Sequence, residues 1–393
     1  MVNVGTMALE DGGRVDFTRL RQERRARVLA AMEAEGLDAL LLGREPNARY
    51  VSGARRLFVA GTRPFAPGCV LVRSTGALHL MSTWEDGVPP EVPREHLYGT
   101  TWNPMHLMAA LGRIEGLPEA RRVGVDGMTP LFAQLLRGVM PEATFVDATP
   151  ALRALRRRKT ADEVSCIRTA VAIAEAASLA VADAIRPGVR ERELVGVLEA
   201  HLAAFGITTP AAEGLCCVAD PVTDGDVPRL RQLPSDRTVE AGDLVAVRSG
   251  ALYAGYEGTV GRTWPCRMHG SEGRTPDQRV LAARWSAVWA ELRDACRPGA
   301  SGADLRAAYE RSGEPLPPFP IAYSAGLGYD EPVAGSHLGT AAEEHRPLEP
   351  DTVLVVQAHV AGPAGGWYGA ETVLLTAEGC EPLTTLAIDP SGG

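Results

Sequence analysis

The chain has 393 residues, which suits two domains of ordinary size better than one. Hydrophobic residues make up 45% and charged residues 23%, close to the averages of globular proteins, so a disordered or fibrous chain is excluded. The net charge of -9 excludes nucleic acid as a partner, and without an apolar run of about 18 residues or an apolar signal core we expect no membrane span, no secretion and a cytoplasmic protein.

The first part of the chain predicts an α/β domain over residues 16–150, preceded by a flexible tail over residues 1–15. Apolar residues at helical spacing predict an exposed helix that closes on Gly36 as its C-cap. A short apolar strand at 37–42 and a turn at 51–53 follow. Further strands, alternating with helical segments, are predicted at 68–73, 77–82, 122–126 and 144–147.

The second part, residues 151–393, predicts a larger domain entered through a basic connector at 151–159. The arginines of this connector are either an anion site or a solvated or interdomain surface, and the second interpretation is favoured. Thr160 and Glu163 form a capping-box pattern that opens a helix to about residue 185. A helix at 191–205, a hairpin at 243–264, helices at 275–296 and 301–313, and strands at 352–360 and 371–376 complete the domain.

The seven cysteines are odd in number and lack the CxxC spacing of metal sites, so we expect free thiols. Adjacent Cys216 and Cys217 are either a reactive pair or small buried apolar residues. We favour the buried interpretation.

Several segments resemble motifs of the creatinase and proline-peptidase family, and they occur in the family's order. GDLVAVRSGALYAGY at 242–256 is similar to the family stretch GDLVxIDxGAxYxGY, GRTW at 261–264 to TRTF, and GLG at 326–328 to the HGxG turn. ETVLLTAEG at 371–379 resembles EDTVLVTEDG, residues 36–53 resemble a motif of the N-terminal half, and residues 156–163 resemble RxxKSPxE at the entry to the catalytic domain. The resemblance implies an α/β (α+β) fold, with a small creatinase-like domain followed by a pita-bread domain of two pseudo-symmetric halves.

Metal-dependent members of this family hold two divalent cations with two aspartates, a histidine and two glutamates. The resemblance carries these positions onto Arg248, Thr259, Ala325, Gln357 and Ala370. A one-residue shift in the glycine-rich loop at 362–369 would bring Glu371 into the last position. The auxiliary histidines are replaced too, since one falls near Arg231 and the motif of the other is shortened. We therefore expect no metal, no cofactor and no conventional metallopeptidase.

The five replacements reverse the charge of the site. Four carboxylates and a neutral imidazole sum to -4, whereas the five residues here sum to +1 because only Arg248 is charged. Four clustered carboxylates without a metal would repel one another or take up protons, so loss of metal binding requires their joint removal. A buried Arg248 needs an anionic partner, which is Glu257, Glu371 or a carboxylate of the substrate.

Polar residues that we expect near the former metal positions provide the candidate chemistry. The acid–base candidates are Glu371, Asp330, Glu331, Tyr329 and Glu257. The substrate-binding candidates are Arg248, Thr259, Tyr323, Ser324, Gln357, His359, Tyr256, Phe58 and Arg63.

Two of these candidates come from the N-terminal domain. The resemblance implies that the segment with Phe58 and Arg63 reaches the active site of a dimer mate, so we expect a homodimer; the alternative is an exposed loop. His359 lies two positions after Gln357, which predicts that both side chains share one strand face.

Three functional hypotheses remain open. The resemblance to creatinase and the ectoine hydrolases implies that this fold supports C–N bond hydrolysis without a metal. The first hypothesis is thus a metal-independent hydrolase, lyase or cyclising enzyme for a small, polar, amino-acid-like or C–N-bonded substrate whose carboxylate meets Arg248. The second is a catalytically inactive relative that binds a ligand or a protein. The third is a peptidase with a rearranged metal site.

Overall fold

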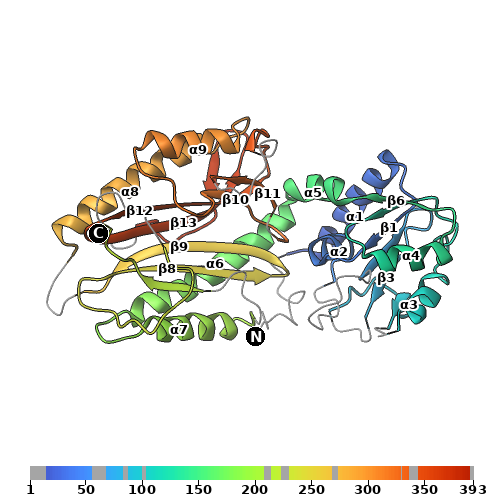
Figure 1. The fold of residues 1–393 in the computed structure, drawn as a ribbon, viewed down its shortest axis with the longest axis horizontal. Coiled ribbons are helices and arrows are strands. Elements are labelled where there is room, and N and C mark those ends of the chain that lie inside the picture. The colour runs from blue at the N-terminus through green and yellow to red at the C-terminus, as the bar shows by residue number, and fades with distance from the viewer. Residues whose placement is uncertain are drawn as a thin grey trace. The chain divides into compact units, whose positions relative to one another are not determined.

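The structure is a computed structural model in which the chain forms two compact units, Val15–Arg156 and a C-terminal unit that begins at Arg157 (Figure 1). It describes residues 15–54, 68–82, 87–99, 103–207, 214–222, 230–267, 273–328, 330–335 and 344–389, with only the backbone of Asp330. The predicted flexible tail therefore lies outside the described residues, except for Val15, which is buried.

The N-terminal unit contains a six-stranded sheet in the order β4-β3-β2-β1-β5-β6. Strand β1 runs antiparallel to β2 and parallel to β5, so the sheet is mixed. Its elements are α1 (Phe17–Ala34), β1 (Ala39–Leu42), α2 (Glu45–Ser52), β2 (Cys69–Val72), β3 (Leu78–Met81), η1 (Arg94–His96), β4 (Leu97–Tyr98), α3 (Pro104–Leu111), β5 (Arg122–Val125), α4 (Pro130–Val139), β6 (Thr144–Asp147) and α5 (Thr149–Arg157).

The predicted first helix and the predicted strands of this unit are present, and Gly36 takes a φ of +64° just after α1. Two segments differ from the prediction. Residues before Gly53 form α2 rather than a turn alone, and the predicted basic connector forms α5. Pro150 lies in the first turn of α5, where a missing N–H costs no intrahelical hydrogen bond. The division between the units accordingly falls after Arg156 rather than after residue 150.

The C-terminal unit contains an eight-stranded sheet in the order β11-β10-β12-β13-β9-β8-β7, with β14 paired to β13. Two long hairpins form its centre, and the pair Ala370 and Gly261 joins them. The elements of this unit are α6 (Ala161–Ala184), α7 (Glu191–Ala204), β7 (Leu215–Val218), β8 (Leu244–Tyr253), β9 (Tyr256–Pro265), α8 (Pro276–Ala295), α9 (Gly302–Arg311), β10 (Ala322–Ser324), β11 (Asp330–Ala334), β12 (Val353–Gly362), β13 (Gly365–Leu375) and β14 (Cys380–Pro382).

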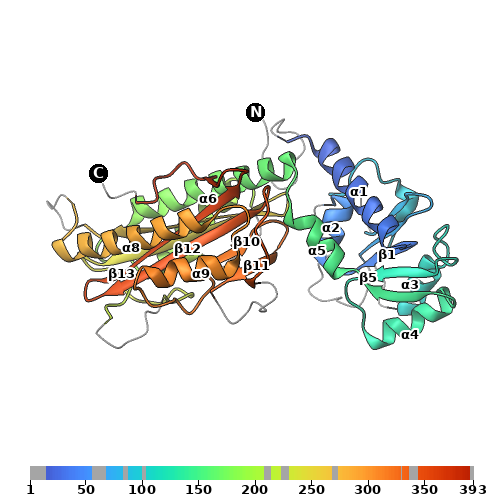
Figure 2. The same ribbon diagram turned by 90° about the horizontal axis from the view of Figure 1, so that it is seen from above.

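Two glycines identify the face of this sheet that the helices cover. A Cβ atom on Gly258 would lie 2.3 Å from the backbone nitrogen of Val171 in α6, and one on Gly369 would lie 2.3 Å from Trp285 in α8. Gly261 and Ala370 are paired and therefore share one face. Gly258 is three residues from Gly261, and Gly369 is next to Ala370, so both of these glycines lie on the opposite face. We call this the helix face and the opposite one the open face. Figure 2 shows α6 and α8 running along the strands.

The start of α6 agrees with the sequence prediction. The Thr160 hydroxyl accepts the Glu163 N–H at 3.2 Å, and the Glu163 carboxylate accepts the Thr160 N–H at 2.8 Å. Contrary to expectation, α6 is long and apolar enough to cross a membrane. However, 56% of its apolar window is buried in the structure, and its residues pack on Gly258. We assign α6 to the core of the C-terminal unit.

The two central hairpins begin and end at places that the sequence did not indicate. Strand β8 continues to Tyr253, and the chain turns at Ala254 and Gly255, which both take positive φ angles of 51° and 83°. Two consecutive positive φ angles match the twist of a two-residue hairpin. The segment expected to be a glycine-rich loop at 362–369 belongs mostly to β12 and β13, because its glycines allow close packing on both faces of the sheet.

All seven cysteines are free, and six of them are buried. Burial raises the pKa of the Cys217 thiol to about 12, and Cys216 is shifted in the same direction for the same reason. These two residues therefore fit the interpretation as small buried apolar side chains.

Candidate functional site

A row of paired residues crosses the open face of the C-terminal sheet. Arg248 pairs with Gly261 between β8 and β9, and Gly261 pairs with Ala370 between β9 and β13. Ala370 in turn pairs with Gln357 between β13 and β12. Directly opposed residues of antiparallel strands lie on the same face, so Arg248 and Gln357 share the open face.

Six predicted site residues and one further residue lie on this face. Residues two positions apart on a strand share a face, and Tyr323 pairs with Val355, two positions before Gln357. We call the group the open-face cluster; its members are Arg248, Glu257, Thr259, Tyr323, Gln357, His359 and Tyr368. The roles of these residues in binding or catalysis stay predictions.

Glu257 is the carboxylate of the open-face cluster, and its side chain is 8% exposed. Its Oε1 atom accepts hydrogen bonds from the Tyr323 hydroxyl and the Thr259 hydroxyl, both at 2.8 Å. Burial raises the pKa of Glu257, although these two bonds and the charge of Arg248 act in the opposite direction. The Oε2 atom has no hydrogen bond from a described residue, so it is available to a substrate or a water molecule.

Tyr368 interacts with the residues at both ends of the row, Gln357 and Arg248. Its hydroxyl donates to Oε1 of Gln357 at 2.9 Å, and Nε2 of Gln357 donates to the carbonyl of Pro320 at 2.6 Å. Burial raises the pKa of Tyr368, and the positive charge of Arg248 opposes this shift. Arg248 itself is partly exposed, and its buried Nε–H has no partner among the described residues. The guanidinium acts on Tyr368, and because the residue is partly exposed, an anionic group can approach it.

His359 is almost fully enclosed, with 1% of its surface exposed. Burial lowers its pKa to about 4, so the imidazole is neutral at physiological pH. Neither ring nitrogen has a hydrogen-bond partner within the described part of the chain. The ring of Phe319 lies beside it, with ring centroids 6.4 Å apart.

Three predicted site residues lie instead on the helix face. The Tyr256 hydroxyl donates to Oε1 of Glu163 at 2.8 Å, and Ser324 accepts a hydrogen bond from Nζ of Lys159 at 3.2 Å. Glu371 pairs with Val356 rather than with Gln357, so the one-residue shift that would bring Glu371 into the row is wrong. Tyr256, Ser324 and Glu371 are separated from the open-face cluster by the sheet itself.

Glu371 has partners for both of its carboxylate oxygens. Nη2 of Arg262 donates to Oε1 at 2.6 Å, and the Thr384 hydroxyl donates to Oε2. Burial raises the pKa of Glu371, and the charge of Arg262 lowers it. Glu371 forms a buried ion pair with Arg262, which also binds two carbonyl groups of the C-terminal segment, and this position does not favour the predicted role of Glu371 as a general base.

The other predicted residues contribute little to the described site. Glu331 lies on β11, where its Oε2 atom is 3.9 Å from Nη2 of Arg157. For Asp330 the backbone pairs with Ser324, and the side chain is not described. Tyr329, Phe58 and Arg63 lie outside the described residues.

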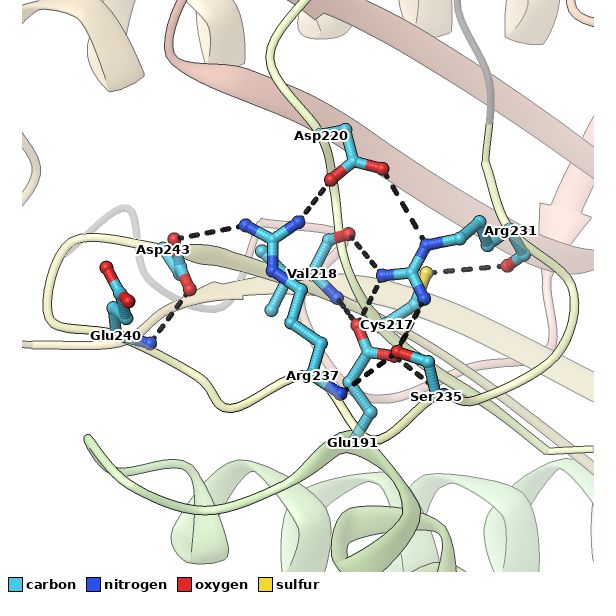
Figure 3. A network of polar contacts seen from close by, with 9 residues as sticks. All are labelled: Glu191, Cys217, Val218, Asp220, Arg231, Ser235, Arg237, Glu240 and Asp243. Carbon is cyan, nitrogen blue, oxygen red and sulfur yellow. Dashed lines mark hydrogen bonds and ion pairs between the residues drawn. The ribbon is translucent and has the colours of Figure 1, made fainter.

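Arg231, predicted to replace an auxiliary histidine, belongs to a polar network beside β7 (Figure 3). Its guanidinium donates to both oxygens of the fully buried Glu191, at 2.5 and 2.9 Å. Burial would raise the pKa of Glu191, but hydrogen bonds from Arg231, Ser235 and the Val218 N–H hold it below its usual value. The network ties the segment at 230–237 to α7 and to β7, the strand next to Arg248.

Tyr368 is the member of the cluster that the sequence reasoning missed. It lies two residues before Ala370, which had been placed at a former metal position. Strand alternation assigns Tyr368 to the same face, but the sequence predicts a loop at 362–369, and alternation does not apply to a loop.

A divalent metal centre needs a different donor set. The open-face cluster offers one carboxylate, Glu257, and one imidazole, His359. Across the part of the chain that the structure describes, no group of three or more His, Cys, Asp or Glu side chains is placed to hold a metal ion. Because two hard divalent cations need several anionic oxygens, these residues do not fit a dinuclear centre.

Comparison with known proteins places the chain in a family. Residues 24–158 match the Creatinase/Prolidase N-terminal domain, and residues 165–377 match Metallopeptidase family M24. The Xaa-Pro dipeptidase of Pyrococcus horikoshii is 24% identical over 289 residues, 73% of this chain and 75% of that protein. The creatinase of a Bacillus species is 24% identical over 409 aligned residues, covering 98% of this chain and 96% of the relative.

Solved structures agree on the fold. The prolidase from Pyrococcus horikoshii OT3 superimposes with a TM-score of 0.71 at 19% identity, covering 92% of this chain and 98% of the other. The X-Pro aminopeptidase from Thermotoga maritima gives 0.72 at 18% identity, covering 92% and 99%. The predicted fold, a creatinase-like α/β domain followed by a pita-bread domain, is confirmed. The chain belongs to metallopeptidase family M24 and carries the N-terminal creatinase/prolidase domain of that family.

Proposed function

We propose that this protein hydrolyses a C–N bond of a small, amino-acid-like substrate without a divalent metal. Arg248 holds a carboxylate of the substrate, and Glu257 moves the proton of the attacking water. The reaction class is supported by the family and by relatives named as dipeptidase, aminopeptidase and creatinase.

The observation that carries the proposal is the state of Glu257. It is a buried carboxyl group with a raised pKa, one oxygen held by Tyr323 and Thr259, and one oxygen without a bond from the described residues. A general base works best when its pKa approaches the working pH and its orientation is fixed. Glu257 accepts a proton from water as the C–N bond is attacked, and returns it to the leaving nitrogen as that bond breaks.

A second observation that supports the proposal is the positive charge of Arg248 in the row of paired residues. Arg248 is the one charged residue among the five positions that the family resemblance assigns to metal ligands, and its side chain is partly exposed. An arginine at this place repels a divalent cation and attracts a carboxylate. This charge and the small number of anionic donors in the open-face cluster support the proposed metal independence.

An inactive relative that binds the same kind of ligand is the alternative. It is supported by the single free carboxylate of the open-face cluster, because many hydrolases divide acid and base work between two groups. Binding of N-substituted amino acids that are recovered unchanged would favour this alternative.

The proposed role of Arg248 is tested with a pair of substrates that differ only at the carboxylate. N-acyl amino acids and their methyl esters are assayed with the wild type, Arg248→Ala and Arg248→Lys. We expect Arg248→Ala to raise KM for the acids by about tenfold or more, the value of one charge-assisted hydrogen bond, and to leave the esters almost unaffected. Arg248→Lys restores part of the binding. An equal loss for acids and esters would show that Arg248 does not hold the carboxylate.

A further inference from the structure

The end of α8 and the start of β14 bring two cysteines side by side. The Cys380 thiol donates to the main-chain oxygen of Arg293 at 3.6 Å, and the Cys296 N–H donates to the same oxygen at 3.2 Å. Cys296 belongs to the buried cluster that contains Trp285, and Cys380 packs against this cluster. The two cysteines are therefore direct neighbours in the fold, although they are far apart in the sequence.

The two thiols differ in exposure and in acidity. Cys296 is 1% exposed, whereas Cys380 is partly exposed. Hydrogen bonding with Cys296 lowers the pKa of the Cys380 thiol, and the same interaction raises the pKa of Cys296. The thiolate is the nucleophile in thiol–disulfide exchange, so Cys380 is placed to react first with a reagent from solvent. Cys296 is then the neighbouring thiol that reacts second.

Both cysteines lie where the backbone changes from one element to the next. Cys296 is the C-cap of α8, with a φ of -79° and a ψ of 78° that depart from the helix, and Cys380 is the first residue of the three-residue strand β14. A disulfide requires Cα atoms about 4.4–6.8 Å apart and a defined orientation of the side chains. The ends of elements reach such a geometry through smaller changes of packing than their centres do.

A second pair of neighbouring cysteines has a different arrangement. Cys216 and Cys217 are consecutive residues of β7, and consecutive side chains of a strand point to opposite faces of the sheet. Both residues are buried, and burial raises the pKa of both thiols. This pair therefore serves as an internal comparison for the pair at α8 and β14.

We propose that Cys296 and Cys380 form a reversible disulfide when a small-molecule disulfide acts as the oxidant, so that the pair is a redox modification site of the C-terminal unit. The Cys380 thiolate attacks one sulfur of the oxidant, and the first small thiolate leaves as a mixed disulfide forms. Cys296 loses its proton to solvent, attacks Sγ of Cys380 and releases the second small thiolate. Two protein thiols are thus oxidised by two electrons, and one small disulfide is reduced to two thiols.

The disulfide would stabilise the attachment of the C-terminal segment. Strand β14 leads into residues whose main-chain groups bind Arg262 and Glu175. The new bond closes a loop of roughly 80 residues and so lowers the conformational entropy of the unfolded chain. We expect oxidation to raise the midpoint of thermal unfolding by about 5–10 °C.

The test uses the full chain, incubated with oxidised glutathione and analysed by intact mass and by peptide mapping. We expect the wild type to lose two hydrogen atoms without gaining a glutathionyl group, and its peptides with Cys296 and Cys380 to be linked. Cys296→Ala stops at the mixed disulfide and carries one glutathionyl group on Cys380. Cys380→Ala removes the first nucleophile, so Cys296 stays a free thiol.

The control is Cys266→Ala, which removes a buried cysteine of the same unit whose thiol is affected by burial and by Asp243. It forms the disulfide and gains thermal stability as the wild type does, whereas neither Cys296→Ala nor Cys380→Ala gains stability with the oxidant. A wild type that keeps its thiols or stops at the mixed disulfide would overturn the inference. So would a link between Cys216 and Cys217 in its place, or an equal rise of the midpoint in Cys380→Ala.

Discussion

Glu257 and Glu371 are two buried glutamates to which we assign different roles: Glu257 is the proposed general base, and Glu371 forms a structural ion pair. Burial raises the pKa of both. Glu371 lies on the helix face with both oxygens bound, to Arg262 and Thr384, whereas Glu257 lies on the open face with one oxygen unbound by described residues. A raised pKa alone therefore does not identify a catalytic residue; the strand face and the free lone pairs decide.

The variant Glu257→Gln tests the general base. It keeps the hydrogen bonds from Tyr323 and Thr259 but cannot accept a proton, so we expect kcat to fall by about 100-fold or more with little change in thermal stability. The matched control Glu371→Gln weakens the ion pair with Arg262, so it lowers the free energy of unfolding instead. The reverse pattern, with activity lost only in Glu371→Gln, would contradict the assignment.

The same variant changes the pH profile. Because only the deprotonated Glu257 acts as a base and burial raises its pKa, activity is present above that pKa and is lost as the pH falls through it. The acid limb of kcat/KM therefore lies above the usual range of a glutamate, near 4.3. We expect Glu257→Gln to abolish this limb in its residual activity. An identical acid limb in the variant would assign it to another group.

At the scale of elements, local signals predicted the helices well. The capping box of Thr160 and Glu163, and the glycine after α1, indicate helix ends through hydrogen bonds that depend only on neighbouring residues. The hairpin between β8 and β9 was placed less well, because its turn uses Ala254 at a positive φ where asparagine or glycine is usual. The error thus has a local backbone cause.

The loop prediction at 362–369 failed for a different reason. The glycine content predicts a loop at 362–369, yet Gly369 packs against Trp285 and Gly366 against His359. Close packing of distant segments is not encoded in neighbouring residues, so the sequence offers no local signal for it. Because no strand was predicted at these residues, Tyr368 could not be assigned to the open face.

The variant Gly369→Ala tests that packing. Its Cβ atom would lie 2.3 Å from Cζ2 of Trp285, so β13 or α8 must move, and we expect a loss of about 1–3 kcal/mol in the free energy of unfolding. Gly379→Ala is the control, since nothing lies within 4 Å of its Cβ position. Denaturant unfolding measures both variants. Equal stabilities would show that the glycine is not required by the contact.

At the scale of the whole molecule, motifs in family order predicted the two-domain fold, and strand alternation predicted that His359 shares a face with Gln357. Arg248, Thr259 and Gln357 could be assigned from aligned positions alone. Tyr256, Ser324 and Glu371 were misplaced because proximity along a strand was not separated from the face of that strand. The partners on the helix face come from α6, from the segment at its start and from the C-terminal segment, which only the tertiary fold brings together.

The fold indicates a relative of metallopeptidases, whereas the charge of the open face of the C-terminal sheet favours an anionic ligand over a metal. The scaffold is shared with metallopeptidases, but the row across the open face carries an arginine and one nearby carboxylate. A site of this composition attracts an anion rather than two divalent cations. The proposed chemistry therefore depends on Glu257 and Arg248 and not on a Lewis acid.

The most direct test is kcat/KM on the best C–N substrate, measured before and after exhaustive chelation, with the metal content of the same samples determined by elemental analysis. The account predicts equal kcat/KM values in chelated protein that contains no bound metal. Activity that falls with chelation and returns with added Mn²⁺, Co²⁺ or Zn²⁺ would contradict it.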